Sequence, residues 1–147
     1  MTSLRQTFAQ NLRKYRELRG YTQDALAALI EVDRTAVSRI ERLAPNLTLE
    51  KVISLGQALD VHPSQLLTSA SSEEHQSIRR YSGVRDVSAT VRALRTDMKL
   101  SQRQLGDKVG LDRNHVSRIE TGEANLALDT LERIIKALGA DITKVLG

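Results

Sequence analysis

The feature that most constrains this chain is an internal repeat. The segment DRTAVSRIE, which begins at Asp33, returns as DRNHVSRIE at Asp112, and seven of the nine positions are identical. Sliding the chain by 79 residues aligns residues 8–67 (copy one) with residues 87–146 (copy two) without a gap, and 17 of those 60 pairs are identical. A single duplication indicates a tandem pair of related domains and not a solenoid of many repeats.

The repeat divides the 147 residues into two domains, expected at 1–67 and 87–147, with a linker over 68–86. Each domain is small but viable, because a 60-residue unit still buries about 60% of the surface that its unfolded chain exposes. The first half of the linker is small and polar, as in flexible connectors. Its second half carries Ile78 and Tyr81, apolar side chains that a neighbouring domain can cover.

Composition excludes several classes of protein. The absence of cysteine rules out disulfide scaffolds, thiolate metal sites and cysteine nucleophiles. Aromatic residues make up only 3% of the chain, too few for the stacking platforms of single-strand and RNA binders. No run approaches the ~20 apolar residues of a membrane span and the start lacks a signal peptide's apolar core, so we expect no membrane partner and a cytoplasmic location. The net charge of +4 permits an anionic partner without requiring one.

Every strong pattern in both copies is helical, which predicts an all-α fold of two five-helix domains. The apolar stripes that open the copies are Phe8, Leu12 and Tyr15, and then Val87, Val91, Leu94 and Met98. Four residues have the side-chain oxygen and the position of a helix N-cap, namely Thr22, Ser101, Asp33 and Asp112. A fourth helix is expected near residues 49–59 and 128–138, and a short fifth helix closes each copy. The predicted inward residues of the fourth helices are Leu49, Val52, Ile53, Leu59, Leu128, Leu131, Ile135 and Leu138.

The segments QDALAALIEVDRTAVSRIE and QRQLGDKVGLDRNHVSRIE each place two short helices around a brief turn, the arrangement of a helix-turn-helix. Such helices cross closely, so the fifth residue must be small, and Ala27 and Gly106 stand there. The turn prefers a residue that tolerates positive φ at the ninth position, which Gly110 satisfies and Glu31 does not. The apolar residues expected on the inner face of the second helices are Val37, Ile40, Val116 and Ile119.

At these residues the chain resembles the five-helix DNA-binding domain of the lambda repressor and Cro superfamily, the XRE family of bacterial and phage regulators. The resemblance rests on the Thr/Ser-Gln opening, the VSRIE helix end and the Asn-Leu pair before the fourth helix, and it covers about 120 of the 147 residues. It implies a sequence-specific reader of double-stranded DNA, in the first place a transcriptional repressor. The second helix of each motif would then enter the major groove.

Candidate DNA contacts combine the outward face of the second helices with the resemblance. Arg34 and Arg113 open these helices, and an arginine there can bond guanine O6 and N7, worth about 1–3 kcal/mol of discrimination. The other candidate base contacts are Thr35, Ser38, Arg39, Asn114, His115, Ser117 and Arg118. The positions that match the family's phosphate contacts are Gln23, Gln102, Asn46 and Asn125. A surface arginine can also be merely solvated, and the asparagines can merely stabilise turns, but retention of both arginine pairs in both copies favours DNA contact.

The resemblance also implies a structural ion pair in each copy, which ties the first helix to the second helix of the motif. The expected pairs are Arg16 with Glu41 and Arg95 with Glu120. The alternative is two unrelated surface charges in each copy. Removing one partner of a buried pair costs about 3–5 kcal/mol, because the other partner stays buried and unpaired.

Two other functions compete with DNA reading. A protein-interaction module, antitoxin-like or an adaptor, is retained for copy one, where Glu31 and Leu43 occupy positions that favour glycine. An enzyme is the weakest class, because no Ser-His-Asp arrangement or phosphate-cradling glycine loop is visible. His62 and His75 have no plausible partners as metal ligands. We expect no cofactor, metal or small-molecule ligand, and the sequence permits a homodimer without requiring one.

Overall fold

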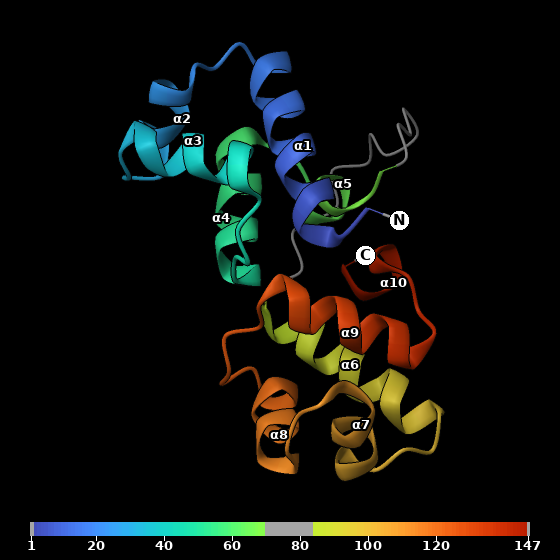
Figure 1. Ribbon diagram of the computed structural model, residues 1–147. Coiled ribbons are helices and arrows are strands. Elements are labelled where there is room, and N and C mark those ends of the chain that lie inside the picture. The colour runs from blue at the N-terminus through green and yellow to red at the C-terminus, as the bar shows by residue number, and fades with distance from the viewer. Residues whose placement is uncertain (1, 70–83, 147) are drawn as a thin grey trace. The chain divides into compact units, whose positions relative to one another are not determined.

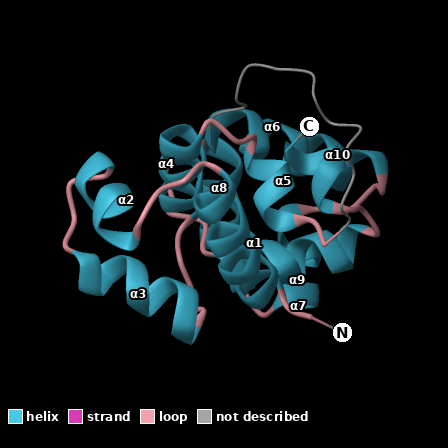
Figure 2. Cartoon of the chain, turned by 90° about the horizontal axis from the view of Figure 1, so that it is seen from above, coloured by secondary structure: helices cyan, strands magenta, loops and turns pink. Residues whose placement is uncertain are grey.

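The computed structural model describes residues 2–69 and 84–146. The helices of the first half are α1 (Leu4–Leu18), α2 (Gln23–Leu29), α3 (Arg34–Leu43), α4 (Leu49–Leu59) and α5 (Pro63–Leu67). Those of the second half are α6 (Val84–Asp97), α7 (Gln102–Val109), α8 (Arg113–Thr121), α9 (Leu128–Leu138) and α10 (Ile142–Leu146). Over these ranges the chain contains helices and loops but no strand (Figure 2), so the predicted all-α class is confirmed.

The chain divides into two compact units (Figure 1). The first unit holds α1–α3, α5 and α4 from Lys51 onward, and the second holds α6–α10. The same helix order therefore occurs twice, as the repeat predicts. α6 begins at Val84, three residues inside the segment that the sequence assigned to the linker. Ile78 and Tyr81 lie outside the described residues.

Each unit is built around the apolar stripes expected from the sequence. In the first unit α1 packs against α3 and α5, and α2 packs against α3; in the second, α6 packs against α8 and α10, and α7 against α8 and α9. The predicted inward residues of α4 and α9 are all buried, as are Phe8 and Leu12 of α1. Met98 is an error of the prediction, because its side chain is 44% exposed. α6 ends at Asp97, so Met98 lies in the following turn and no longer follows the stripe of Val87 and Val91.

Side-chain caps fix where the helices of both motifs begin. Thr22 and Ser101 accept hydrogen bonds from the backbone amides of Ala25 and Gln104, at 3.0 Å in each case. The carboxylates of the aspartates that precede α3 and α8 accept from the amides three residues on, at 2.9 Å and 2.7 Å. All four N-caps predicted from the sequence are confirmed, namely Thr22, Ser101, Asp33 and Asp112. These caps satisfy amide groups that the first turn of a helix leaves without a partner.

α10 begins with a similar cap. The Asp141 carboxylate accepts hydrogen bonds from the Thr143 hydroxyl and from the Lys144 backbone amide, the latter at 2.9 Å. Hydrogen bonds to the ionised carboxylate, first that from Thr143, hold the pKa of Asp141 below its ordinary value. At the corresponding place in copy one the ring of His62 caps α5, with Nδ1 accepting from the Ser64 amide at 3.1 Å.

Left-handed backbone occurs at four related places in the two copies, and at each place only one copy has glycine. The pairs, with their φ values, are Gly20 (74°) and Lys99 (58°), Glu31 (58°) and Gly110 (75°), Ala44 (46°) and Gly122 (80°), and Asp60 (54°) and Gly139 (64°). A non-glycine residue in this conformation costs roughly 1–2 kcal/mol, because its Cβ crowds the following carbonyl. Three of the four non-glycine residues in this conformation lie in copy one, so copy one carries more of this backbone strain.

Candidate nucleic-acid interface

Both helix-turn-helix motifs make the left-handed turn that the sequence suggested, although only copy two has glycine there. A Cβ placed on Gly106 would collide with the carbonyl of Leu111, so the crossing in the second unit accepts only glycine without movement. At the ninth position Glu31 adopts the same left-handed conformation as Gly110. The turn in copy one is therefore strained and not remodelled. Both copies lead the chain into their second helix in the same way.

The second helices of the motifs, α3 and α8, turn their apolar residues inward as predicted. The four inner residues are between 0% and 5% exposed, namely Val37, Ile40, Val116 and Ile119. This orientation leaves most of the candidate base contacts exposed to solvent, namely Arg34, Thr35, Arg39, Arg113, Asn114, His115 and Arg118. Ser38 and Ser117 are half-buried at the margin of the same face. We call this outward face of α3 and of α8 the recognition face.

The predicted phosphate contacts lie at two places outside α3 and α8. Gln23 and Gln102 are the first residues of α2 and α7 and are half-buried. Asn46 and Asn125 are exposed in the loops that lead into α4 and α9. Their roles as phosphate contacts stay predictions.

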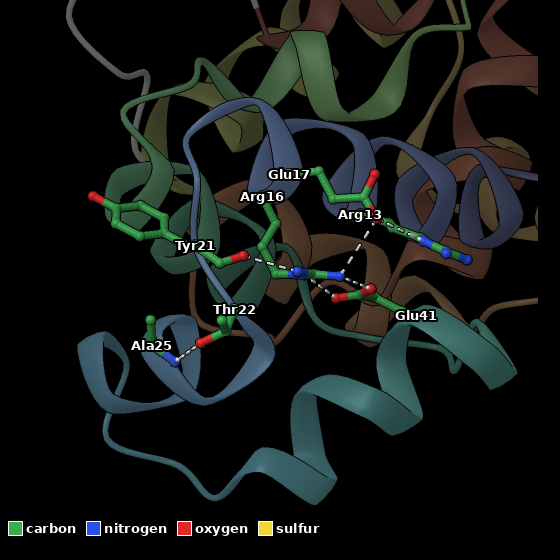
Figure 3. A network of polar contacts seen from close by, with 7 residues as sticks. All are labelled: Arg13, Arg16, Glu17, Tyr21, Thr22, Ala25 and Glu41. Carbon is green, nitrogen blue, oxygen red and sulfur yellow. Dashed lines mark hydrogen bonds and ion pairs between the residues drawn. The ribbon is translucent and has the colours of Figure 1, made fainter.

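The ion pairs implied by the resemblance are present in both copies. In Figure 3 the Arg16 guanidinium faces Glu41, with Nε donating to Oε2 at 2.8 Å and Nη2 to Oε1 at 3.0 Å, while Nη1 donates to the Tyr21 carbonyl at 2.8 Å. The hydrogen bond to the Glu41 carboxylate raises the pKa of Arg16, because it favours the charged guanidinium. Copy two repeats the geometry with Arg95 and Glu120, at 2.8 Å and 2.9 Å.

These bidentate pairs anchor the recognition helices to the first helix of each unit. Glu41 and Glu120 lie on α3 and α8, and their side chains are 5% and 2% exposed. A nearly buried carboxylate with two guanidinium bonds allows little rotation of the helix that carries it. The recognition face of each copy is therefore presented at a fixed angle to its own unit.

Sequence reasoning missed a second set of arginines, which bond the carbonyls of helix ends. Arg5 Nε donates to the carbonyl of Ala44, just past α3, at 2.9 Å. Arg19 donates to the carbonyls that end α4, from Nε to Leu59 at 2.9 Å and from Nη2 to Asp60 at 3.0 Å. Arg133 Nη1 donates to the last carbonyl of α7 at 3.1 Å. The partners are 24 to 41 residues apart, so no local spacing could have indicated them.

The arginines whose side chains the structure describes thus fall into two groups. One group donates side-chain hydrogen bonds within the protein and comprises Arg5, Arg13, Arg16, Arg19, Arg95 and Arg133. The other is exposed and, over residues 2–69 and 84–146, makes no side-chain hydrogen bond or ion pair within the chain; it comprises Arg34, Arg39, Arg42, Arg92, Arg103, Arg113 and Arg118. Most of this second group lies on α3 and α8. Free guanidinium groups are concentrated where DNA would be read.

The described residues lack two kinds of feature. No helix in residues 2–69 and 84–146 is long and apolar enough to span a bilayer. The same residues hold no cluster of histidine, cysteine, aspartate and glutamate that could bind a metal ion.

Comparisons with known proteins match each copy separately. The model of the helix-turn-helix family HTH_3 matches residues 12–66 and again residues 91–145. The chain is 32% identical over 73 residues to the control protein C.SmaI of Serratia marcescens, which covers 50% of this chain and 87% of that protein. It is 36% identical over 61 residues to the immunity repressor protein of Bacillus phage phi105, which covers 42% of each chain.

A solved structure also matches part of the chain. The crystal structure of the hypothetical transcription factor NHTF from Neisseria is 38% identical, with a TM-score of 0.43, and the match covers 45% of this chain and 76% of that one. The two relatives named above each correspond to about half of the chain, whereas the family model accounts for both halves. The chain belongs to the HTH_3 family of XRE or lambda-repressor-like helix-turn-helix proteins, whose domain it carries twice in tandem, and it is a DNA-binding regulator.

Proposed function

We propose that this protein is a transcriptional repressor that reads double-stranded DNA through the major groove with α3 and α8. The observation that carries the proposal is the set of free arginines that the two recognition faces share, Arg34 and Arg39 in copy one and Arg113 and Arg118 in copy two. Exposed guanidinium groups that have no partner among the described residues are available for guanine O6 and N7, which arginine contacts in bidentate fashion. The similarity to an immunity repressor supports repression over activation.

One chain would occupy two half-sites. Half-sites on one face of DNA lie about 34 Å apart, one helical turn, and the segment 68–83 between α5 and α6 can reach about 55 Å when extended. Tethering raises the effective concentration of the second domain once the first is bound. Since Arg34 and Arg39 are repeated as Arg113 and Arg118, the half-sites should be related and each should contain guanine. They should differ where Thr35 and Ala36 are replaced by Asn114 and His115.

Selection of duplexes by the full chain from a random pool tests this proposal. We expect two related, guanine-containing half-sites, and an affinity that falls steeply with salt because phosphate neutralisation releases counterions. Two unrelated half-sites, or half-sites without guanine, contradict the proposed reading. Failure to enrich any duplex favours the protein-interaction module instead.

The repressor role needs a separate measurement. A reporter promoter that overlaps the selected site should lose expression when the chain is present and recover with the double variant Arg34→Ala/Arg113→Ala. An increase in expression with the wild-type chain shows an activator.

A further inference from the structure

We propose that the two copies hold the DNA backbone with different side chains: Arg42 at the end of α3 in copy one, and Arg103 at the start of α7 in copy two. This inference rests on the proposed DNA-reading function and adds to it two phosphate contacts that are not shared between the copies. Both arginines are exposed, and within residues 2–69 and 84–146 neither has a side-chain hydrogen bond or ion pair.

Arg42 extends the recognition face of copy one by one turn. It follows Ser38 by four residues and Arg39 by three, so it lies on the same side of α3 as both of them. The opposite side of the helix is occupied by the buried Val37 and Ile40. Arg42 therefore points with the recognition face and stands furthest from the base-reading N-terminal turn, where a side chain reaches the backbone of the duplex.

The end of α3 is built differently from the end of α8. α8 stops at Thr121 with Gly122 in the left-handed conformation, whereas α3 continues through Leu43 and the left-handed residue is Ala44. The carbonyl of Ala44 accepts the hydrogen bond from Arg5, which fixes this longer end. Arg42 thus stands within the ordered last turn of α3 and not in a frayed end.

Copy two offers no equivalent of Arg42. Thr121 occupies the matching position, and its hydroxyl donates to the Arg118 carbonyl of its own helix at 3.1 Å. A short neutral side chain that is bonded to its own backbone cannot supply a cationic phosphate contact.

Copy two has instead a free arginine on the preceding helix. Arg103 follows Gln102, the first residue of α7, and α7 turns Leu105, Gly106 and Val109 into the core. Asp107 lies one turn further along the exposed side, but no ion pair joins it to Arg103.

Copy one carries the opposite charge at this place. Asp24 is exposed at the second residue of α2, where its carboxylate would repel a phosphate. Copy two has Arg103 where copy one has Asp24, and copy one has Arg42 where copy two has Thr121. Each copy therefore has one cationic contact that the other lacks. The arginines proposed to read bases are the same in both copies, but the arginines proposed to contact the DNA backbone stand at different positions.

Reciprocal substitutions in the full chain test the inference on the selected duplex. Arg42→Thr and Arg103→Asp each give one copy the residue of the other. We expect each to lower the slope of log affinity against log salt by about 0.9 or more, since one phosphate contact is lost, and to leave the preferred sequence unchanged. Thr121→Arg and Asp24→Arg should raise the slope by a similar amount. All four positions are exposed, so thermal unfolding should move little and will report any variant that fails to fold.

Arg92 supplies the matched control, because it is an exposed arginine of α6, outside the helix-turn-helix, and has no side-chain partner within residues 2–69 and 84–146. Arg92→Thr and Arg92→Asp should change the salt slope less than the test variants do. If Arg34→Ala and Arg113→Ala lower affinity while Arg42→Thr and Arg103→Asp behave like the Arg92 variants, the inference is wrong and the proposed function stands. If none of these arginine variants affects binding, the proposed function fails as well. A change of base preference in Arg42→Thr also overturns the inference, because a phosphate contact carries no sequence information.

Discussion

At the scale of single residues, two arginine–glutamate pairs fix the position of the recognition helices, and in each pair the arginine donates two hydrogen bonds to the glutamate. Besides the two bonds to glutamate, Arg16 and Arg95 each donate a third to a backbone carbonyl, that of Tyr21 at 2.8 Å and of Leu100 at 2.7 Å. The pairs were inferred from family resemblance, but the carbonyl bonds were not foreseen. They connect α1 and α6 to the residues that immediately precede the helix-turn-helix of each copy. One side chain thus orients both helices of the helix-turn-helix.

The first prediction concerns the loss of one partner of such a pair. Glu120→Ala should lower the free energy of unfolding of the second unit by about 3–5 kcal/mol, because Arg95 remains nearly buried without its carboxylate. Glu123→Ala is the control: Glu123 is exposed, and its loss should cost less than about 0.5 kcal/mol. Urea denaturation of the full chain measures both variants. Equal midpoints for the two would show that the pair contributes nothing to stability.

A second residue-level prediction follows from the lowered pKa of Asp141. A folded-state pKa below the unfolded value means that the ionised cap stabilises the fold above the unfolded pKa of about 3.9, and that this stabilisation is lost as pH falls through the folded pKa. Asp141→Ala should therefore be less stable than wild type near neutral pH and converge with it in acid. Unfolding free energies over a pH series check this expectation. A difference that persists unchanged in strong acid contradicts it.

At the scale of the helices, the sequence predicted how elements begin better than how they end. Helix starts depend on local chemistry, such as the cap of Asp33 or Ser101, and that chemistry is written within three residues. Helix ends depend on left-handed residues, and glycine marks only half of them here. Lys99 and Ala44 are left-handed without any sequence signal, and Asp60 has only the weak preference of aspartate for this conformation. The exposed position of Met98 was missed for the same reason, because it lies beside the left-handed Lys99.

Remote arginines accompany two of these unfavourable ends. Arg5 bonds the carbonyl of Ala44, and Arg19 bonds those of Leu59 and Asp60. In copy two the matching residue of Asp60 is Gly139, and that of Arg19 is Met98. The end of α9, which is formed by Gly139, therefore has no matching arginine, whereas the end of α4, which is formed by Asp60, has Arg19. The guanidinium bonds to free carbonyls offset part of the cost of the left-handed residue.

This compensation gives a prediction that copies the arrangement of copy two into copy one. Arg19→Met should lower the free energy of unfolding of the first unit by about 1–2 kcal/mol. This is less than the loss of a buried hydrogen bond from a charged group would cost, because Arg19 is exposed to solvent. Adding Asp60→Gly should recover about 0.5–1 kcal/mol, since glycine adopts φ of 54° without crowding, although it also frees the unfolded chain. Chemical denaturation measures the series. Arg13→Met is the control, because Arg13 makes only an exposed ion pair with Glu17. An Arg19→Met no more destabilising than this control would show that the carbonyl bonds do not matter.

At the scale of the whole molecule, duplication lets one chain present two recognition faces that are alike in framework and different in detail. The ion pairs, the aspartate caps of α3 and α8 and the inward valine and isoleucine of these two helices are the same in both units, so each recognition face is oriented in the same way. Differences gather on the exposed positions, where Thr35 and Ala36 of copy one become Asn114 and His115. The candidate base contacts were readable from the sequence because they repeat at a fixed offset. The longer α3 was not, since it depends on how the left-handed residue and Arg5 meet at Ala44.

The last prediction is that copy two contributes more to sequence-specific binding than copy one. Both copies offer the same pair of arginines, but Asn114 and His115 can hydrogen-bond base edges or phosphates, whereas Ala36 cannot. The strain at Glu31 argues in the same direction, because it lowers the stability of the motif in copy one without altering its conformation. Arg113→Ala should therefore cost more affinity on the selected duplex than Arg34→Ala, and each loss should fall within the range of about 1–3 kcal/mol for a guanine contact. Titrations at one salt concentration compare them, with Arg92→Ala as the exposed control. If Arg34→Ala costs as much as Arg113→Ala or more, the asymmetry is wrong and the two copies read DNA as equals.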